Sequence, residues 1–162
     1  MGGIETPVEH SGESHTLFLD AANWCEPSRR DGLEFVIVRE DSLVDLIREN
    51  LTVNQQGFDE NAPEVDEFAA DAFRSSLRGG AAMTLRCDGI PVAAGMFTPV
   101  RSGRCELVGI TTLMRFRRQG FGAALTSQLA RAALDAGAQT VFLTTGDEDA
   151  LRTYRRVGFR AV

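Results

Sequence analysis

The sequence contains no lysine, because all 17 basic residues among its 162 are arginines. A Walker-type phosphate loop, a Schiff-base lysine and a Ser-Lys dyad each require a primary amine, so all three are excluded. The sequence also lacks an apolar run of about 18 residues, and its first residues have no apolar segment typical of a signal peptide. We therefore expect a cytoplasmic protein that does not interact with membranes.

Cysteine is scarce as well. Cys25, Cys87 and Cys105 are odd in number and widely spaced, which matches neither a disulfide framework nor a set of metal ligands. We expect free thiols in a reducing compartment and no metal site. The length, with 43% apolar and 25% charged residues, suits one globular domain.

Charge is distributed unevenly along the chain. Residues 1–80 carry 17 acids and 6 arginines, a net charge of −11, whereas residues 81–162 carry 6 acids and 11 arginines, a net charge of +5. The acidic half argues against nucleic-acid binding by the whole chain, and the basic half is suited to an anionic ligand.

The first half of the chain predicts a leader, a strand and two helices. We interpret residues 1–32 as an N-terminal leader with a possible extra strand over 16–22, and residues 33–162 as the single domain, which begins with an apolar strand. Asp41 and Ser42 are candidate caps of a following helix. The second helix, over 64–77 after a loop around Gly57, directs its apolar side chains inward: Val65, Phe68, Ala69, Ala72 and Phe73.

The second half predicts a sheet with long connections. In order it contains strands over 82–87, 90–100 and 106–113, a helix that ends at Gly137, a strand over 140–144, a helix over 147–157 and a last extended segment. Short turns favour antiparallel pairing, and helical crossovers require some parallel pairing. We therefore predict an α/β fold with a mixed, mostly antiparallel central sheet and helices on both faces.

The most specific segment lies between a predicted strand and a predicted helix. Two glycines there allow a tight turn and a close approach to a ligand, and the first amides of the helix have no intrahelical acceptor. With two arginines as mobile charges, the segment is suited to bind a pyrophosphate. The candidate binding residues are Arg117, Arg118, Gln119, Gly120, Phe121, Gly122 and Ala123.

This glycine-containing segment has two other interpretations, a dinucleotide-binding loop and a purely structural turn. A dinucleotide fingerprint would need a third glycine where Leu125 stands, and an acid about twenty residues further on is missing. A purely structural glycine turn is compatible with the local sequence taken alone.

Two patterns follow each other in the second half. Residues 117–122 have the form Arg-x-x-Gly-x-Gly, and residues 147–159 have the form Asp-x-x-Ala-x-x-x-Tyr-x-x-x-Gly-Phe. In their order of strand, loop, helix, strand and helix, residues 106–159 resemble the core of the GNAT superfamily of N-acetyltransferases. The family's second motif begins with Asn, which Asp147 replaces here.

The resemblance implies acetyl-CoA as co-substrate. Its pyrophosphate would lie on the glycine-containing loop, and its pantetheine arm in a V-shaped split between two parallel strands, paired with the backbone of Ile110, Thr111 and Thr112. Asp147, in the second motif, is a further candidate for cofactor binding. The implied reaction is direct transfer of the acetyl group to an amine of a small molecule or of a peptide or protein N-terminus.

Acetyl transfer requires a neutral attacking amine and protonation of the departing thiolate. Tyr154 is the only tyrosine in the chain and falls where relatives place a phenol beside the thioester sulfur, so the resemblance implies a general acid. Glu106 stands fourteen residues before Gly120, where some relatives place a base that acts through water. A solvent-facing carboxylate, or a reaction without a dedicated base, are the alternatives.

The acceptor and the activity are less constrained by the sequence. The acidic half would hold the two helices that commonly border the acceptor site in the family. Acids there could attract a cationic amine or form a solvated face; they are Asp59, Glu60, Glu64, Asp66 and Glu67. A catalytically silent acyl-CoA-binding or interaction domain on the same scaffold is the alternative function, because Asp147 departs from the motif and the base is open.

The sequence stops three residues after Phe159, where relatives usually continue through a further strand. An N-terminal strand could take its place, a partner chain could complete the sheet, or the edge could stay open. A homodimer is therefore one of the expected arrangements.

Overall fold

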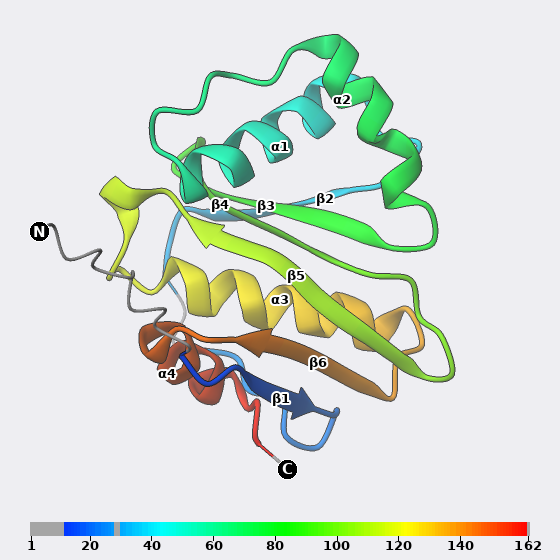
Figure 1. Cartoon of the computed structure of the whole chain (residues 1–162), viewed down its shortest axis with the longest axis vertical. Helices are drawn as coiled ribbons and strands as arrows, with labels where there is room; N and C mark the ends of the chain where they lie inside the picture. Colours follow the sequence, from blue (N-terminus) through cyan, green and yellow to red (C-terminus); the bar gives the residue numbers. More distant parts are fainter. Residues whose placement is uncertain (1–11, 28–29, 162) are drawn as a thin grey trace, which may run out of the picture.

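The computed structural model describes residues 12–27 and 30–161, so residues 1–11 and 28–29 of the predicted leader over 1–32 lie outside the described residues. The described chain contains six strands, four α-helices and two short 3-10 helices (Figure 1). In chain order these are β1 (His15–Leu19), β2 (Leu33–Val38), α1 (Val44–Phe58), α2 (Glu67–Phe73), η1 (Arg74–Leu77), β3 (Ala81–Cys87), β4 (Ile90–Phe97), β5 (Arg104–Thr112), η2 (Met114–Phe116), α3 (Phe121–Asp135), β6 (Thr140–Thr145) and α4 (Glu148–Val157).

The strands form one six-stranded sheet in the order β1-β6-β5-β4-β3-β2. Every neighbouring pair is antiparallel except β5 and β6, which are parallel. The long connection through α3 explains this exception, because parallel neighbours need a crossover and hairpin neighbours do not. The predicted mixed, mostly antiparallel sheet is confirmed.

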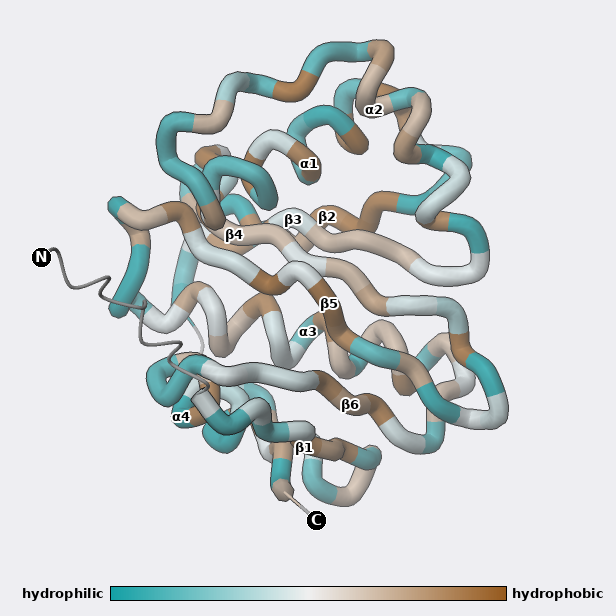
Figure 2. Tube along the Cα trace, viewed as in Figure 1, coloured by the Kyte–Doolittle hydropathy of each residue, from teal (hydrophilic) through white to brown (hydrophobic). Residues whose placement is uncertain are grey.

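Helices cover both faces of the sheet, as predicted (Figure 1). α1 packs on β3, β4 and β5 with α2 against it, and α3 packs with α4 on the other face. Each pair of helices closes its own hydrophobic cluster of buried side chains. Figure 2 shows hydrophobic stretches of β5 and β6 beside α3, where the larger cluster lies.

The helix predicted over 64–77 differs in its start and its phase. Asp66 caps α2 by accepting a hydrogen bond of 2.7 Å from the Ala69 amide, so the helix begins at Glu67, and η1 replaces its last turn. Val65 is buried as predicted and Phe73 is half-buried, but Ala69 and Ala72 are exposed, and Ala70 and Leu77 are buried in their place. Phe68 was predicted to point inward, but it is 85% exposed, because α2 packs on α1 through Ala70 and Phe73 instead.

The preceding helix also differs from the prediction at both ends. Neither Asp41 nor Ser42 caps α1: the N-cap is Leu43, and the Ser42 hydroxyl accepts a hydrogen bond of 2.8 Å from the Arg39 amide. At the other end, Gly57 lies inside α1 and not in a loop. The local sequence therefore predicted that this helix exists, but the predicted first and last residues were wrong.

β1 lies between β6 and the segment that follows α4. It pairs with β6 from His15↔Thr145 to Leu19↔Val141. On its other side Phe18 and Arg160 exchange two backbone hydrogen bonds of 2.8 and 2.9 Å. The extended segment predicted after α4 is therefore a single bridge, and the N-terminal strand occupies the position beside β6. The homodimer stays a prediction.

Candidate functional site

The parallel strands β5 and β6 separate along their length. Paired residues run from Arg104↔Thr140 to Glu106↔Phe142, and no further pair forms between these two described strands. β5 continues to Thr112, so its backbone groups on that side have no strand partner beyond Glu106. The two strands form a V-shaped split with its apex at Glu106, and Ile110, Thr111 and Thr112 line its β5 arm.

A β-bulge bends the β5 arm. Val108 pairs with Met96 and Thr111 pairs with Ala94, which leaves β5 one residue longer than β4 between the two pairs. Gly109 within the bulge has a φ of +64°, a left-handed value that glycine adopts without a steric penalty. A bulge bends and twists its strand, which is consistent with the divergence of β5 from β6.

α1 supports the bulge from one face of the sheet. The Asn54 side-chain amide donates a hydrogen bond to the Gly109 carbonyl oxygen. Gly57 approaches β5 so closely that a Cβ at this position would be 2.4 Å from the Thr111 side-chain methyl and hydroxyl groups. Sequence reasoning missed both residues. A glycine within an otherwise helical pattern is the signal that could have identified Gly57.

The turn before α3 has the backbone geometry predicted for an anion site. Gly120 is the N-cap of α3 with a φ of +84°, and Arg118 has a φ of +63°. Two left-handed residues this close together reverse the chain sharply. The glycine is therefore required by the backbone here, as the motif suggests.

The first turn of α3 presents free amides beside the split. The Ala124 amide donates to the Gly120 carbonyl, so the preceding amides of the helix have no intrahelical acceptor. A Cβ on Gly122 would be 3.5 Å from Thr112 Oγ1, which places this turn against the end of the β5 arm. The free amides, with the partial positive charge of the helix start, belong to Phe121, Gly122 and Ala123.

Arg117 has a different role from the expected mobile charge. Its guanidinium donates from Nε to the Thr112 carbonyl (3.0 Å) and from Nη2 to the Gly57 carbonyl (2.6 Å). It therefore ties the loop both to the end of β5 and to α1. Arg118 and Gln119 are exposed, which leaves the Arg118 guanidinium accessible to an anion.

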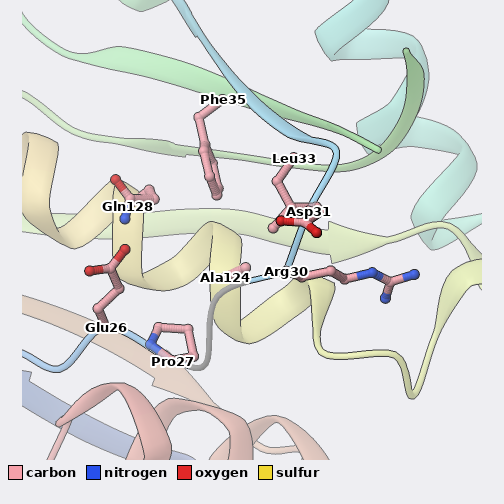
Figure 3. A pocket seen from close by; sticks show the side chains of 8 residues that line it. All are labelled: Glu26, Pro27, Arg30, Asp31, Leu33, Phe35, Ala124 and Gln128. Atoms are coloured by element: carbon pink, nitrogen blue, oxygen red, sulfur yellow. The ribbon is translucent and has the colours of Figure 1, made fainter. Parts of the chain in front are cut away.

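Arg30 was not identified by sequence reasoning. It donates a hydrogen bond of 3.1 Å to the Gln119 carbonyl and lies 4.4 Å over the Phe121 ring, so a third arginine braces the loop. In Figure 3 its side chain extends away from Glu26 and Gln128 at the edge of a cavity of about 220 Å³. The cavity is lined by Glu26, Pro27, Arg30, Asp31, Leu33, Phe35, Ala124 and Gln128. No local pattern around Arg30 signals this contact.

Tyr154 lies on α4 with its ring half-buried. The ring meets Phe159 edge-on, with 6.2 Å between the centroids. Burial, with a smaller contribution from the negative charge of Asp147, raises the pKa of Tyr154 to about 12. The phenol therefore keeps its proton at neutral pH and is available as a donor.

Asp147 caps the helix that carries Tyr154. Its carboxylate accepts hydrogen bonds from the Asp149 amide (2.8 Å) and the Ala150 amide (3.4 Å). The residue that replaces the motif's Asn thus satisfies the first amides of α4. Its predicted contact with the cofactor stays a prediction.

Glu106 is the other candidate catalytic residue and lies at the apex of the split. Its neighbours Cys105 and Leu107 are buried on the α3 side, so the half-buried Glu106 side chain points to the opposite face. Its backbone amide donates to Thr98 Oγ1 at 2.9 Å. Glu106 and Tyr154 therefore lie on opposite faces of the sheet, because Tyr154 packs against the cluster on the α3 side.

Residues 41–159 match the family model described as the acetyltransferase (GNAT) family. The chain belongs to the GNAT acetyltransferase family. No curated protein matches it.

Solved structures contain the same GNAT fold. A GCN5-related N-acetyltransferase from Kribbella flavida is 26% identical with a TM-score of 0.70, over 91% of this chain and 53% of that chain. A tandem GNAT protein from the clavulanic acid biosynthesis pathway is 14% identical (TM-score 0.67, over 91% of this chain and 50% of that chain). An aminoglycoside acetyltransferase from an uncultured soil metagenomic sample is 14% identical (TM-score 0.63, over 78% of this chain and 88% of that chain).

The acids predicted near the acceptor lie in and beside the loop between α1 and α2 of this GNAT fold. Several have local partners: Asp66 caps α2, Asp59 accepts from the Asn61 amide at 3.1 Å, and Glu64 lies 3.7 Å from Arg48. Part of the negative charge of this loop is therefore bound to groups of the protein itself. Its predicted attraction for an amine stays a prediction.

Among residues 12–27 and 30–161, no group of three or more His, Cys, Asp or Glu side chains is arranged to hold a metal ion. None of the helices in this part of the chain has the length and apolar character to cross a membrane.

Proposed function

We propose that this GNAT chain is an acetyl-CoA-dependent N-acetyltransferase that moves the acetyl group directly to an amine of a small molecule or of a peptide or protein N-terminus. One observation carries the proposal: the unpaired arm of β5 leads to the free amides of α3. Such an arm can pair with an extended chain, and a helix start attracts a pyrophosphate. Acetyl-CoA carries both groups in that order.

The residues present fit this co-substrate. The pyrophosphate would be held by the loop residues Arg117, Arg118, Gln119, Gly120, Phe121, Gly122 and Ala123, and the pantetheine arm by the backbone of Ile110, Thr111 and Thr112. When bound, acetyl-CoA supplies an activated thioester. Arg117 positions the loop through two backbone carbonyls, while Arg118 is exposed and offers its charge to the ligand.

The candidate catalytic residues divide the proton transfers between them. Glu106 accepts the proton of the attacking amine through a water molecule, and the new C–N bond forms as the C–S bond breaks. Tyr154 donates its proton to the leaving sulfur, and its pKa of about 12 keeps the phenol protonated until then. One proton leaves the amine and one reaches the sulfur, so the reaction is balanced.

Direct transfer is favoured over a route through an acetylated cysteine. Cys105 neighbours Glu106 at the apex of the split, but its side chain is buried in the core on the α3 side. Burial raises the pKa of this thiol to about 11, so it stays protonated and weakly nucleophilic near neutral pH.

Two measurements test this proposal together. Acetyl-CoA should raise the melting temperature of the protein, and thiol should be released from acetyl-CoA only when an amine is added. The amine panel should contain peptides, polyamines, amino acids and aminoglycosides. A thermal shift without thiol release would instead support the silent acyl-CoA-binding domain, and the absence of a shift would contradict both functions.

A further inference from the structure

No helix among residues 12–27 and 30–161 covers one half of a sheet face beside the apex of the split. Leu17 and Leu19 of β1 are buried in the cluster under α3 and α4, as are the alternate residues of β6. Phe18 and Phe142 therefore point to the opposite face, where α1 lies over β3, β4 and β5 (Figure 1). Both rings remain half-exposed.

Four side chains form a row across this open half, starting at the apex. Glu106 is paired with Phe142, Phe142 with Phe18, and Phe18 with Arg160, so all four side chains lie on one face. The two rings in the middle have centroids 6.3 Å apart and are tilted by 36°. The row thus has an acid at one end, an apolar floor and a base at the other end.

The two charged ends are available for a ligand. Within residues 12–27 and 30–161, neither Glu106 nor Arg160 forms a salt bridge with another side chain. Three strand spacings separate them, which is about 14 Å between their backbones. Peptide chains extend by about 3.5 Å per residue, so two to four residues would span the gap.

We propose that this row is the acceptor site, and that the acceptor is an amine with an apolar body and a carboxylate at its far end. The amine lies at Glu106 beside the thioester, the apolar body covers Phe142 and Phe18, and Arg160 holds the carboxylate. A short apolar peptide with free termini has this chemistry. The inference rests on the proposed transferase function and specifies its substrate class.

Arg104 is a second cation on the same face. It precedes Glu106 by two residues in β5 and is exposed. Arg104 lies on the side of Glu106 away from the open end of the split. An acceptor whose carboxylate was bound to Arg104 would therefore not extend over the rings of Phe142 and Phe18. The experiment therefore has to distinguish Arg104 from Arg160.

The test compares a tripeptide, leucyl-leucyl-phenylalanine, with its C-terminal amide. The wild-type protein should acetylate the free acid with a kcat/KM about tenfold higher, because a charged hydrogen bond holds the carboxylate. Arg160→Gln should lower kcat/KM for the free acid to about the value for the amide, which removes this preference. Arg39→Gln is the matched control, because Arg39 follows β2 at the opposite edge of the sheet.

Equilibrium binding of the two peptides in the presence of CoA gives a readout that needs no turnover. Tighter binding of the acid that is lost in Arg160→Gln supports the inference, even in a protein without activity. Equal use and equal binding of acid and amide would overturn it, as would a preference that survives Arg160→Gln or disappears in Arg104→Gln instead. Turnover of both peptides without preference would leave the transferase function standing.

Discussion

Tyr154, the proposed general acid, combines a half-buried ring with a hydroxyl that the proposal brings to the reacting sulfur. Its edge-on contact with Phe159 fixes the ring, so the hydroxyl is the part of the side chain left for chemistry. A phenol with a pKa of about 12 is a weak acid, but it loses its proton only as the thiolate forms. Removing the hydroxyl should therefore lower the rate of catalysis and leave the packing of the ring unchanged.

Tyr154→Phe should lower kcat by about 100-fold, in the range for loss of a general acid. Acetyl-CoA affinity should change by less than about twofold, because the aromatic ring and the phosphate-binding turn are retained. Steady-state kinetics give kcat, and titration calorimetry with acetyl-CoA provides the control. An unchanged kcat would refute the assignment of Tyr154 as the acid.

At the scale of elements, the close contact between α1 and β5 determines the position of the split arm. Gly57 allows the helix to approach Thr111, Asn54 binds the bulge, and the Gly57 carbonyl accepts from Arg117 of the loop. One end of α1 thus contacts both the unpaired part of β5 and the loop before α3. A change in this contact should affect stability and ligand binding together.

Gly57→Ala should destabilise the protein by about 1–3 kcal/mol, as overpacking does in other interiors. In an ordinary helix the same change would stabilise by about 0.5–1 kcal/mol. The sign reverses because the new Cβ would meet the Thr111 side chain at 2.4 Å. Urea denaturation measures the stability, and calorimetry should show weaker acetyl-CoA binding.

Gly146→Ala is the control for Gly57→Ala, because a Cβ there meets no atom within 4 Å. Adding Thr111→Ala to Gly57→Ala should restore part of the lost stability, since it removes the two atoms at 2.4 Å. A Gly57→Ala protein as stable as the wild type would show that this contact does not hold the arm in place.

At the scale of the whole molecule, ionisation of buried groups should limit stability in alkali. Folding raises the pKa of Cys105 from 9.0 to about 11 and that of Tyr154 from 10.0 to about 12. A raised pKa means that the folded state holds its proton more tightly than the unfolded state. The resulting stabilisation is complete below pH 9 and is lost progressively between pH 9 and about pH 12.

The free energy of unfolding should therefore fall as pH rises through this window. Tyr154→Phe should flatten the fall above pH 10, and Cys105→Ala should flatten it from pH 9 to about 11. Urea denaturation at a series of pH values measures the slope. Because Tyr154 is the only tyrosine, tyrosinate absorbance also reports its ionisation directly. A midpoint near pH 10 in the folded protein would contradict the prediction.

The sequence predicted the parts of the fold that depend on local patterns. Apolar segments and short turns identified every strand of the sheet, and a loop with two glycines located the turn before α3. Helix limits were less accurate, because the start of α2 depends on where Asp66 caps it. Phe68 was misplaced because α2 packs on α1 through Ala70 and Phe73 instead.

Contacts between distant segments were not predictable in the same way. Arg30 meets Gln119, and Asn54 meets Gly109, across separations that no local pattern records. Arg117 matches the motif, yet its guanidinium binds two backbone carbonyls. Motif spacing therefore located the candidate site, while the side chains that hold its shape emerge only from tertiary structure.

The position of β1 determines the order in which this sheet can be completed during synthesis. Leu17 and Leu19 are made before β6, and their partners Leu143 and Val141 follow them by more than a hundred residues. Pairing between such distant segments is slow, because a large loop must close first. β1 therefore stays unpaired, with its apolar residues uncovered, until β6 has been made. The split can acquire its β6 arm, with β1 beside it, only after that point of synthesis.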